Sequence, residues 1–209
     1  MEVKVIEEEI NVAGSQIFQR KYHNSENKKN MLLLHGWAFT SKNWEDIGVF
    51  DHFSRLGFNV YAIDYPGFGK SPSSEKYGID RGKITNGSKL VNDYLAASGL
   101  DHAFLLGASM GGGIVMRSIL DFPQKVDGVI AVAPAWVENE ENRMKKIEKP
   151  VLFIWGSEDS LISPDLGKIY AKAVNGSELE IIKGAGHPAY LHNPEEFFSL
   201  SEKFLKKFS

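Results

Sequence analysis

Apolar positions along the chain form short runs that alternate with helix-length segments. The runs lie at 31–34, 58–63, 103–106, 126–133, 150–155 and 178–182, and the helix-length segments at about 43–56, 80–98, 110–121, 164–174 and 194–207. Parallel strands need crossover connections, and helices both supply them and cover the sheet. The pattern therefore predicts an α/β fold with a mostly parallel sheet and helices on both faces.

Two intervals depart from this alternation. Residues 3–9 and 16–22 are typical of two short strands joined by the turn NVAGS, so we expect an N-terminal antiparallel hairpin. The segment 134–149, between two predicted strands, has room for one short charged helix and not for an inserted domain. Because no repeat or linker divides the chain, we expect a single domain over residues 1–209.

Composition narrows the classes of function. The 24 Lys and Arg and the 27 Asp and Glu are scattered along the 209 residues, so we expect neither a nucleic-acid nor a membrane partner. The chain has no cysteine, which excludes disulfides, thiolate metal sites and a cysteine nucleophile. No His, Asp and Glu cluster has the spacing of metal ligands, and we expect no cofactor. In the absence of a signal-peptide pattern or a long apolar segment, a cytoplasmic protein is the default expectation, as a monomer or weak homodimer.

One serine in a glycine-rich segment marks candidate chemistry. Residues 107–111 read Gly-Ala-Ser-Met-Gly and match G-x-S-x-G, the nucleophile elbow, in which serine lies on a strained turn between a strand and a helix. Gly107 and Gly111 would let other backbone segments pass close to Ser109, and the helix N-terminus favours negative charge. Alone, the motif fits an ordinary glycine-rich turn equally well.

The residues that would activate this serine lie after two other strands. A serine hydroxyl needs a base that takes its proton, and the base needs an acceptor that holds its tautomer. Asp159 follows the run 150–155 and His187 follows the run 178–182, so both belong to the same edge of the sheet as Ser109. The order Ser, Asp, His is also the one expected after an elbow. The sequence therefore predicts a catalytic triad of Ser109, Asp159 and His187.

Other titratable residues have simpler interpretations. His23 lies in a polar loop, His52 in a predicted helix, and His102 at the start of a strand, at the opposite edge of the sheet. His192 precedes an Asn-Pro pair that leads into the last helix, which leaves it as the weaker alternative for the base. Glu158 is best explained as a solvated loop charge.

Acyl transfer also needs hydrogen-bond donors at the oxyanion. The backbone N–H of Met110 is one expected donor, and the N–H of Trp37, in the loop after the run 31–34, is the other. His35 is interpreted as a buried histidine that bonds nearby loops, and Asp64 as an acceptor for loop amides. Five side chains that flank these loops are candidates for the walls of a substrate pocket or for the core: Phe39, Trp136, Leu161, Pro188 and Tyr190.

Five segments together resemble the α/β-hydrolase superfamily: HGW at 35–37, DYPGFGKS at 64–71, GASMGG at 107–112, GSED at 156–159 and GAGHPAYLHNPEEF at 184–197. The chain is similar to small, lid-less members such as the α/β-hydrolase domain-containing protein 14 family. This resemblance implies an eight-stranded sheet with a first antiparallel pair, the same triad and the same oxyanion hole. Unlike many relatives, the chain has no room for a cap between the sixth and seventh strands, and its serine nucleophile separates it from haloalkane dehalogenases.

These features predict hydrolysis of a small-molecule carboxylic ester through an acyl-enzyme. Because an uncapped pocket offers little apolar area to a long chain, we expect a preference for short acyl groups. Two alternatives remain. The same triad could serve an acyltransferase or an amide deacylase, and the chain could be a non-catalytic ligand receptor on the same fold.

Overall fold

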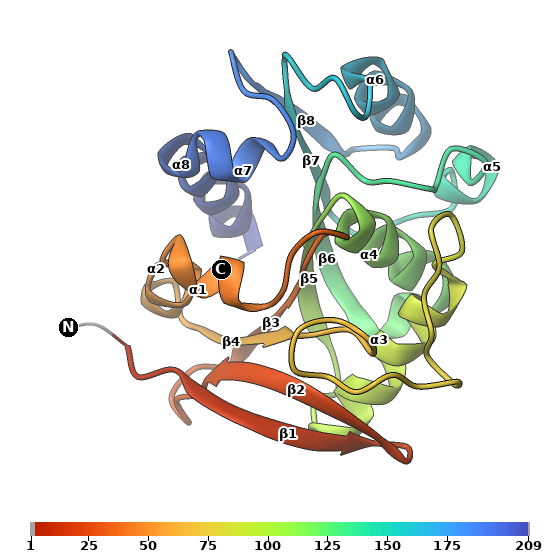
Figure 1. Ribbon diagram of the computed structural model, residues 1–209. Coiled ribbons are helices and arrows are strands. Elements are labelled where there is room, and N and C mark those ends of the chain that lie inside the picture. Colours follow the sequence, from red (N-terminus) through yellow and green to blue (C-terminus); the bar gives the residue numbers. More distant parts are fainter. Residues whose placement is uncertain (1–2, 209) are drawn as a thin grey trace.

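A twisted eight-stranded sheet forms the centre of the computed structural model, which describes residues 3–208 (Figure 1). The strand order is β1-β2-β4-β3-β5-β6-β7-β8. The strands are β1 (Ile6–Val12), β2 (Ser15–Tyr22), β3 (Lys29–Leu34), β4 (Phe58–Ile63), β5 (Ala103–Ala108), β6 (Val126–Val132), β7 (Val151–Gly156) and β8 (Glu178–Ile182). β2 pairs antiparallel with β1 and β4. The remaining neighbours, β4-β3-β5-β6-β7-β8, all pair in parallel.

Helices cover both faces of this sheet (Figure 1). One face carries α3 (Thr85–Ala97), α4 (Met110–Asp121), α5 (Glu141–Met144) and α6 (Pro164–Ala173). The other carries α1 (Lys42–Asp46), α2 (Val49–Arg55), α7 (Ala189–His192) and α8 (Pro194–Leu205), and two 3-10 turns lie at Pro123–Lys125 and Lys206–Phe208. The predicted fold class, with a mostly parallel sheet between two helical layers, is confirmed.

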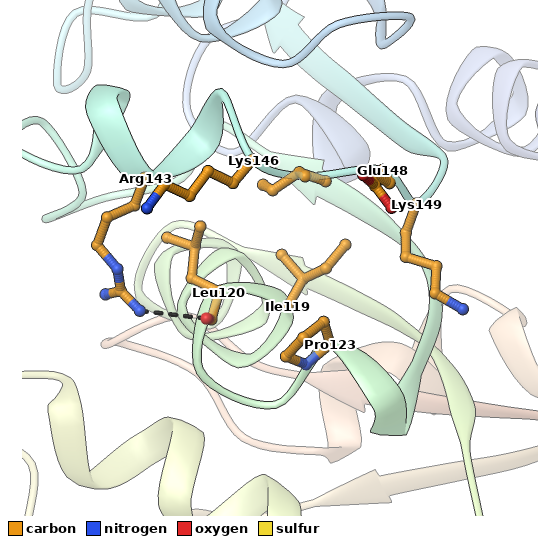
Figure 2. A pocket seen from close by; sticks show the side chains of 8 residues that line it. Ile119, Leu120, Pro123, Arg143, Lys146, Glu148 and Lys149 are labelled. Carbon is orange, nitrogen blue, oxygen red and sulfur yellow. Dashed lines mark hydrogen bonds between the residues drawn. The ribbon is translucent and has the colours of Figure 1, made fainter.

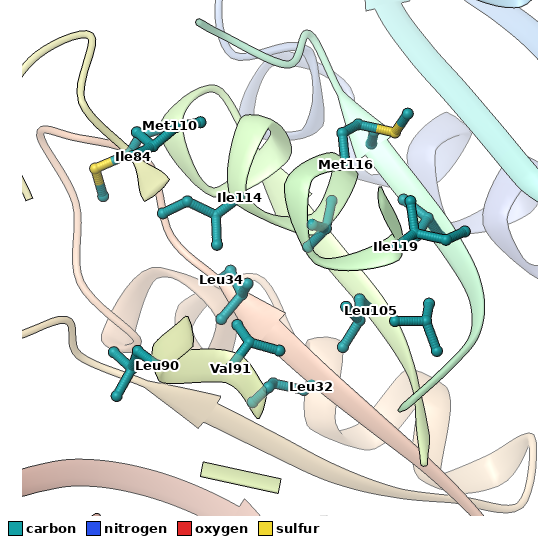
Figure 3. Close-up of a cluster of buried hydrophobic side chains, with 14 of the residues drawn as sticks. Leu32, Leu34, Ile84, Leu90, Val91, Leu105, Met110, Ile114, Met116 and Ile119 are labelled. Atoms are coloured by element: carbon teal, nitrogen blue, oxygen red, sulfur yellow. The ribbon is translucent and has the colours of Figure 1, made fainter. Parts of the chain in front are cut away.

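Alternating side chains of the central strands form two hydrophobic cores. On β3, Leu32 and Leu34 point to the core beneath α3 and α4, whereas Met31 and Leu33 point to the core beneath α2 and α8. Figure 3 shows the first core, where β3 and β5 side chains meet those of the two helices. Strands buried on both faces read as continuous apolar runs, which is why the sequence located them.

The structure corrects several predicted boundaries. The hairpin strands at 3–9 and 16–22 lie instead at Ile6–Val12 and Ser15–Tyr22, because the turn is confined to Ala13 and Gly14, both at positive φ. The helix expected at 43–56 is two helices, separated at Gly48, whose φ of 82° is left-handed. The helix expected from residue 80 begins at Thr85, since residues 80–83 form a turn.

The connection between β6 and β7 contains only the four-residue helix α5, so this position holds no cap domain. Two ion pairs tie the connection to α4: Arg117 pairs with Glu140, and Asp121 pairs with Arg143 at 2.6 Å. Within the connection, Arg143 also pairs with Glu140 at 3.0 Å. No inserted domain between β6 and β7 therefore covers the carboxyl ends of these strands. Within residues 3–208, none of the helices combines the length and the apolar character that a bilayer crossing requires.

Candidate active site

Ser109 occupies the turn between β5 and α4 in a strained backbone conformation. Its φ of 55° and ψ of −116° are rarely adopted by a residue with a side chain. The N–H of Ser109 donates to the carbonyl of Val132 at 2.8 Å, and its carbonyl accepts from the N–H groups of Gly113 and Ala135 at 2.9 and 3.0 Å. Contacts from β6 and from the loop after it thus hold the strained turn.

Close backbone packing explains the glycines on each side of Ser109. A Cβ on Gly107 would lie 2.3 Å from the carbonyl oxygen of Gly111, and a Cβ on Gly111 would lie 2.1 Å from that of Leu34. Both distances are far below van der Waals contact, so the role predicted for these glycines is confirmed. The loop after β3 also touches the elbow, since a Cβ on Gly36 would lie 3.5 Å from the Cβ of Ser109.

Asp159 and His187 are hydrogen-bonded to each other. The Nδ1–H of His187 donates to Oδ2 of Asp159 at 2.7 Å. The other carboxylate oxygen accepts the backbone N–H groups of Leu161 and Ile162, both at 2.9 Å, and the Asp159 side chain is fully buried. A fixed carboxylate thus keeps the proton of His187 on Nδ1 and leaves Nε2 with a free lone pair.

Ser109 and His187 line one pocket, with a volume of about 420 Å³. The other lining residues are Trp37, Arg81, Ala135, Trp136, Glu138, Leu161, Ile162, Ser163 and Leu166. The Leu161 side chain at the rim is exposed, with 76% of its surface open to solvent. This pocket combines a hydroxyl, an oriented imidazole and an open rim that mixes apolar and charged side chains.

The predicted pocket walls are only partly correct. Trp136 and Leu161 line the pocket, but Phe39, Pro188 and Tyr190 are not among its lining residues. Tyr190 is fully buried in the opposite core, where its ring stacks on Trp44 with centroids 4.6 Å apart.

Pro188 and Phe39 also face elsewhere. Pro188 is buried at the start of α7. Phe39 lies over the loop backbone, with its ring 3.3 Å from the position of a Cβ on Gly36. The sequence placed these residues next to functional loops but could not show the direction of their side chains.

Two charged lining residues were missed by the sequence analysis. Arg81 comes from the long segment between β4 and α3, and Glu138 from the connection between β6 and β7. The turn signal Asp-Arg-Gly at 80–82 could have indicated an exposed arginine, but nothing local indicates that this turn reaches the pocket.

The expected oxyanion donors lie on two sides of the serine. Met110 is the first residue of α4, where N–H groups have no acceptor within the helix. Trp37 belongs to the loop that packs on the elbow, and its indole lines the pocket, edge-on to Trp136 at 5.9 Å between ring centroids. Their role as oxyanion donors stays a prediction.

The structural interpretations of His35 and Asp64 are confirmed. His35 is fully buried; its Nδ1–H donates to the carbonyl of Gly36 at 2.8 Å, and its Nε2 accepts the N–H of Tyr65 at 3.2 Å. Burial lowers the pKa of His35 to about 4, so the ring is neutral. Asp64 accepts the backbone N–H groups of Ser41 and Lys70 at 2.7 and 2.9 Å.

The remaining histidines lie outside the pocket. Nδ1 of His192, the alternative base, accepts the N–H of Gly186 at 3.0 Å. His102 pairs with Asp127 at 2.6 Å, His52 stacks on Phe198, and His23 lies 3.1 Å from the hydroxyl of Tyr61.

A second groove of about 500 Å³ lies at the far end of α4 (Figure 2). Its floor is apolar, and the Arg143 guanidinium at one end donates to the carbonyl of Leu120. It contains no serine, aspartate or histidine, so it offers no triad chemistry. Within residues 3–208, no group of three or more His, Cys, Asp and Glu side chains is arranged to hold a metal ion.

Comparisons with known proteins agree with this architecture. Residues 29–149 match the model of the alpha/beta hydrolase fold family. Protein ABHD14A of Danio rerio is 30% identical over 199 residues, which cover 95% of this chain and 69% of that protein. The Homo sapiens protein named "Putative protein-lysine deacylase ABHD14B" is 28% identical over 201 residues, which cover 94% of this chain and 93% of that protein.

Solved structures extend the comparison. The crystal structure of a predicted CIB-like hydrolase from Thermoplasma acidophilum has a TM-score of 0.95 and 47% identity, covering 98% of this chain and 99% of that one. Naproxen esterase from Bacillus subtilis shares the fold, with a TM-score of 0.82, 17% identity, and coverage of 97% and 92%. The chain therefore belongs to the alpha/beta hydrolase fold family and is a hydrolase related to ABHD14A and ABHD14B.

Proposed function

We propose that this chain hydrolyses short-chain carboxylic esters through an acyl-enzyme formed on Ser109. The observation that carries the proposal is the 2.7 Å hydrogen bond from His187 to the buried Asp159, because His187 lines the same pocket as Ser109. An imidazole fixed in this way presents an unprotonated Nε2, which is what a serine nucleophile needs as its base.

In the proposed reaction, Ser109 Oγ attacks the ester carbonyl carbon while its proton moves to Nε2 of His187. The N–H groups of Trp37 and Met110 donate to the oxyanion of the tetrahedral intermediate. When the intermediate collapses, the C–O bond to the alcohol breaks and His187 gives its proton to the leaving oxygen. Water then attacks the acyl-enzyme with His187 again as base, which releases the acid and restores Ser109.

The size and openness of the pocket support short acyl groups. Its volume of about 420 Å³ includes the space for the leaving alcohol, and no cap covers the exposed Leu161 at the rim. The distal part of a long acyl chain would stay in water and would gain little from burial. We therefore expect acetyl and butyryl esters to be turned over faster than palmitoyl esters, and the reverse order would contradict this specificity.

The decisive test is the replacement Ser109→Ala, assayed with p-nitrophenyl acetate. We expect kcat/KM to fall by about a thousandfold or more, because the nucleophile is lost. Ser160→Ala is the matched control, since this exposed serine lies in the same loop as Asp159 but does not line the pocket. A fluorophosphonate probe should label the wild-type chain and not the Ser109→Ala variant. Failure to label the wild type would support a non-catalytic receptor instead.

Amide deacylation, or acyl transfer to an acceptor other than water, is the second candidate. The name of the ABHD14B relatives supports it, together with the open rim, which would admit an acylated side chain presented by a larger molecule. An acetyl-lysine peptide compared with p-nitrophenyl acetate would distinguish amide from ester specificity. Adding a thiol and measuring acyl-thioester would detect transfer. Ester hydrolysis with neither of these products would eliminate the second candidate.

A further inference from the structure

Arg81 is held at the mouth of the pocket by a tight turn. The N–H of Lys83 donates to the carbonyl of Asp80 at 2.9 Å, and Gly82 adopts the positive φ of 78° that closes such a turn. Arg81 therefore occupies the tip of the turn, and it lines the same pocket as Ser109 and His187.

The guanidinium of Arg81 lacks the partner that the other arginines have. Arg20, Arg55, Arg117 and Arg143 each pair with at least one carboxylate. Within residues 3–208, Arg81 pairs with none. It lies over the indole of Trp37 instead, with its central carbon 5.4 Å from the ring centroid.

This placement suits the recognition of an anion. Guanidinium presents its N–H donors in one plane that matches a carboxylate, and stacking on an aromatic ring leaves the donors at the edge of that plane available. Trp37 thus restrains the guanidinium without using its hydrogen-bonding groups, and the donors of this exposed side chain stay available to a ligand.

Building on the proposed ester hydrolysis, we propose that Arg81 determines specificity by binding a carboxylate carried by the substrate. The preferred ester then bears a negative charge away from the bond that is cleaved. Glu138, which lines the pocket from the connection between β6 and β7, carries the opposite charge. It repels the same carboxylate, so the two side chains together orient the substrate.

Two matched pairs of esters test this inference and locate the carboxylate. In the first pair the charge lies on the acyl side: p-nitrophenyl hemiglutarate is compared with p-nitrophenyl pentanoate. In the second pair it lies on the leaving group: 4-acetoxybenzoate is compared with its methyl ester. Each kcat/KM is divided by the rate of alkaline hydrolysis of the same ester, so that intrinsic reactivity cancels.

We expect the wild type to prefer one charged ester over its neutral partner by about tenfold, the scale of one hydrogen-bonded ion pair. Arg81→Gln should bring that ratio close to one, mainly by raising KM for the charged ester. Arg81→Lys should keep part of the preference, because it retains the charge but not the planar donors. Lys83→Gln is the matched control: it removes the same charge two residues away, outside the pocket, and should leave the ratio unchanged.

A ratio that Arg81→Gln does not alter would overturn the inference. An equal fall of the charged-to-neutral ratio in Lys83→Gln would also overturn it, since that result would indicate long-range electrostatic attraction by any nearby positive charge and not a contact with Arg81. If the wild type cleaves neutral esters without any preference that depends on Arg81, only this inference fails. If it cleaves none of the four esters, the proposed function fails and the inference fails with it.

Discussion

The replacement Asp159→Asn separates the orientation of His187 from the other role of this side chain. Oδ1 accepts two backbone N–H groups, from Leu161 and Ile162, whereas Oδ2 accepts the Nδ1–H of His187. In asparagine only the carbonyl oxygen can accept from two donors, so it must take the place of Oδ1. The amide NH₂ group then faces His187.

An NH₂ group that faces Nδ1 donates a hydrogen bond where the carboxylate accepted one. His187 must then carry its proton on Nε2, and it can no longer take the proton of Ser109. The equivalent substitution in a serine protease triad lowers kcat by about 10⁴. At about 1.4 kcal/mol for each tenfold, this corresponds to a loss of about 5.5 kcal/mol in transition-state stabilisation. We expect a loss of the same order here.

Unfolding measurements on Asp159→Asn and Asp159→Ala separate the loss of activity from a loss of stability. Asp159→Asn keeps an acceptor for both N–H groups, so its free energy of unfolding should stay within about 1 kcal/mol of the wild type. Asp159→Ala leaves both groups without an acceptor, at about 1–3 kcal/mol each. The assay is kcat with p-nitrophenyl acetate beside urea unfolding of all three chains. A folded Asp159→Asn variant that retains more than about a tenth of the wild-type kcat would refute the triad.

Three further variants probe the elbow, the buried histidine and the core. Gly111→Ala would put a Cβ 2.1 Å from the carbonyl oxygen of Leu34, and we expect the displaced oxyanion loop to lower kcat by about a hundredfold; wild-type kcat would contradict this. Burial lowers the pKa of His35 from 6.5 in the unfolded chain to about 4 in the folded one, so the unfolded state binds the proton first as pH falls. The contribution of the neutral His35 to the free energy of unfolding is therefore complete above pH 6.5. Between pH 6.5 and 4 the wild type should lose about 3 kcal/mol that a His35→Gln variant does not lose; equal pH slopes in urea unfolding would exclude this role. The buried hydroxyl of Tyr190 has no hydrogen-bond partner among residues 3–208, so Tyr190→Phe should stabilise the chain by up to about 1 kcal/mol without changing esterase activity. A fall in kcat/KM would indicate that Tyr190 contacts the substrate after all.

The boundaries that the sequence predicted well are those with sharp chemical contrast. β4, α4 and β8 lie at the predicted residues because apolar runs there end abruptly in glycine, serine or charged residues. The predicted helix at 43–56 failed because its apolar periodicity continues across Gly48, where a left-handed backbone interrupts the hydrogen bonds. Periodicity reports which face is buried, not whether the backbone is continuous.

The candidate site shows a similar division. Strand ends place Ser109, Asp159 and His187 at one edge of the sheet, and topology alone is enough to bring them together. Pocket walls depend on side-chain direction, which no local pattern encodes. The sequence therefore offered no reason to prefer Trp136 over Tyr190 as a pocket wall. Arg81 lies in a long connection whose path over the sheet is set by distant contacts.

The backbone bonds of Ser109 also define where this scaffold tolerates new material. Residues 132–135 support the nucleophile directly, because Val132 accepts its N–H and Ala135 donates to its carbonyl. A grafted lid that entered within this stretch would release the elbow. Glu138 and Asn139 are exposed just beyond it, so the peptide bond between them is the junction at which an engineered lid could be inserted over an intact nucleophile.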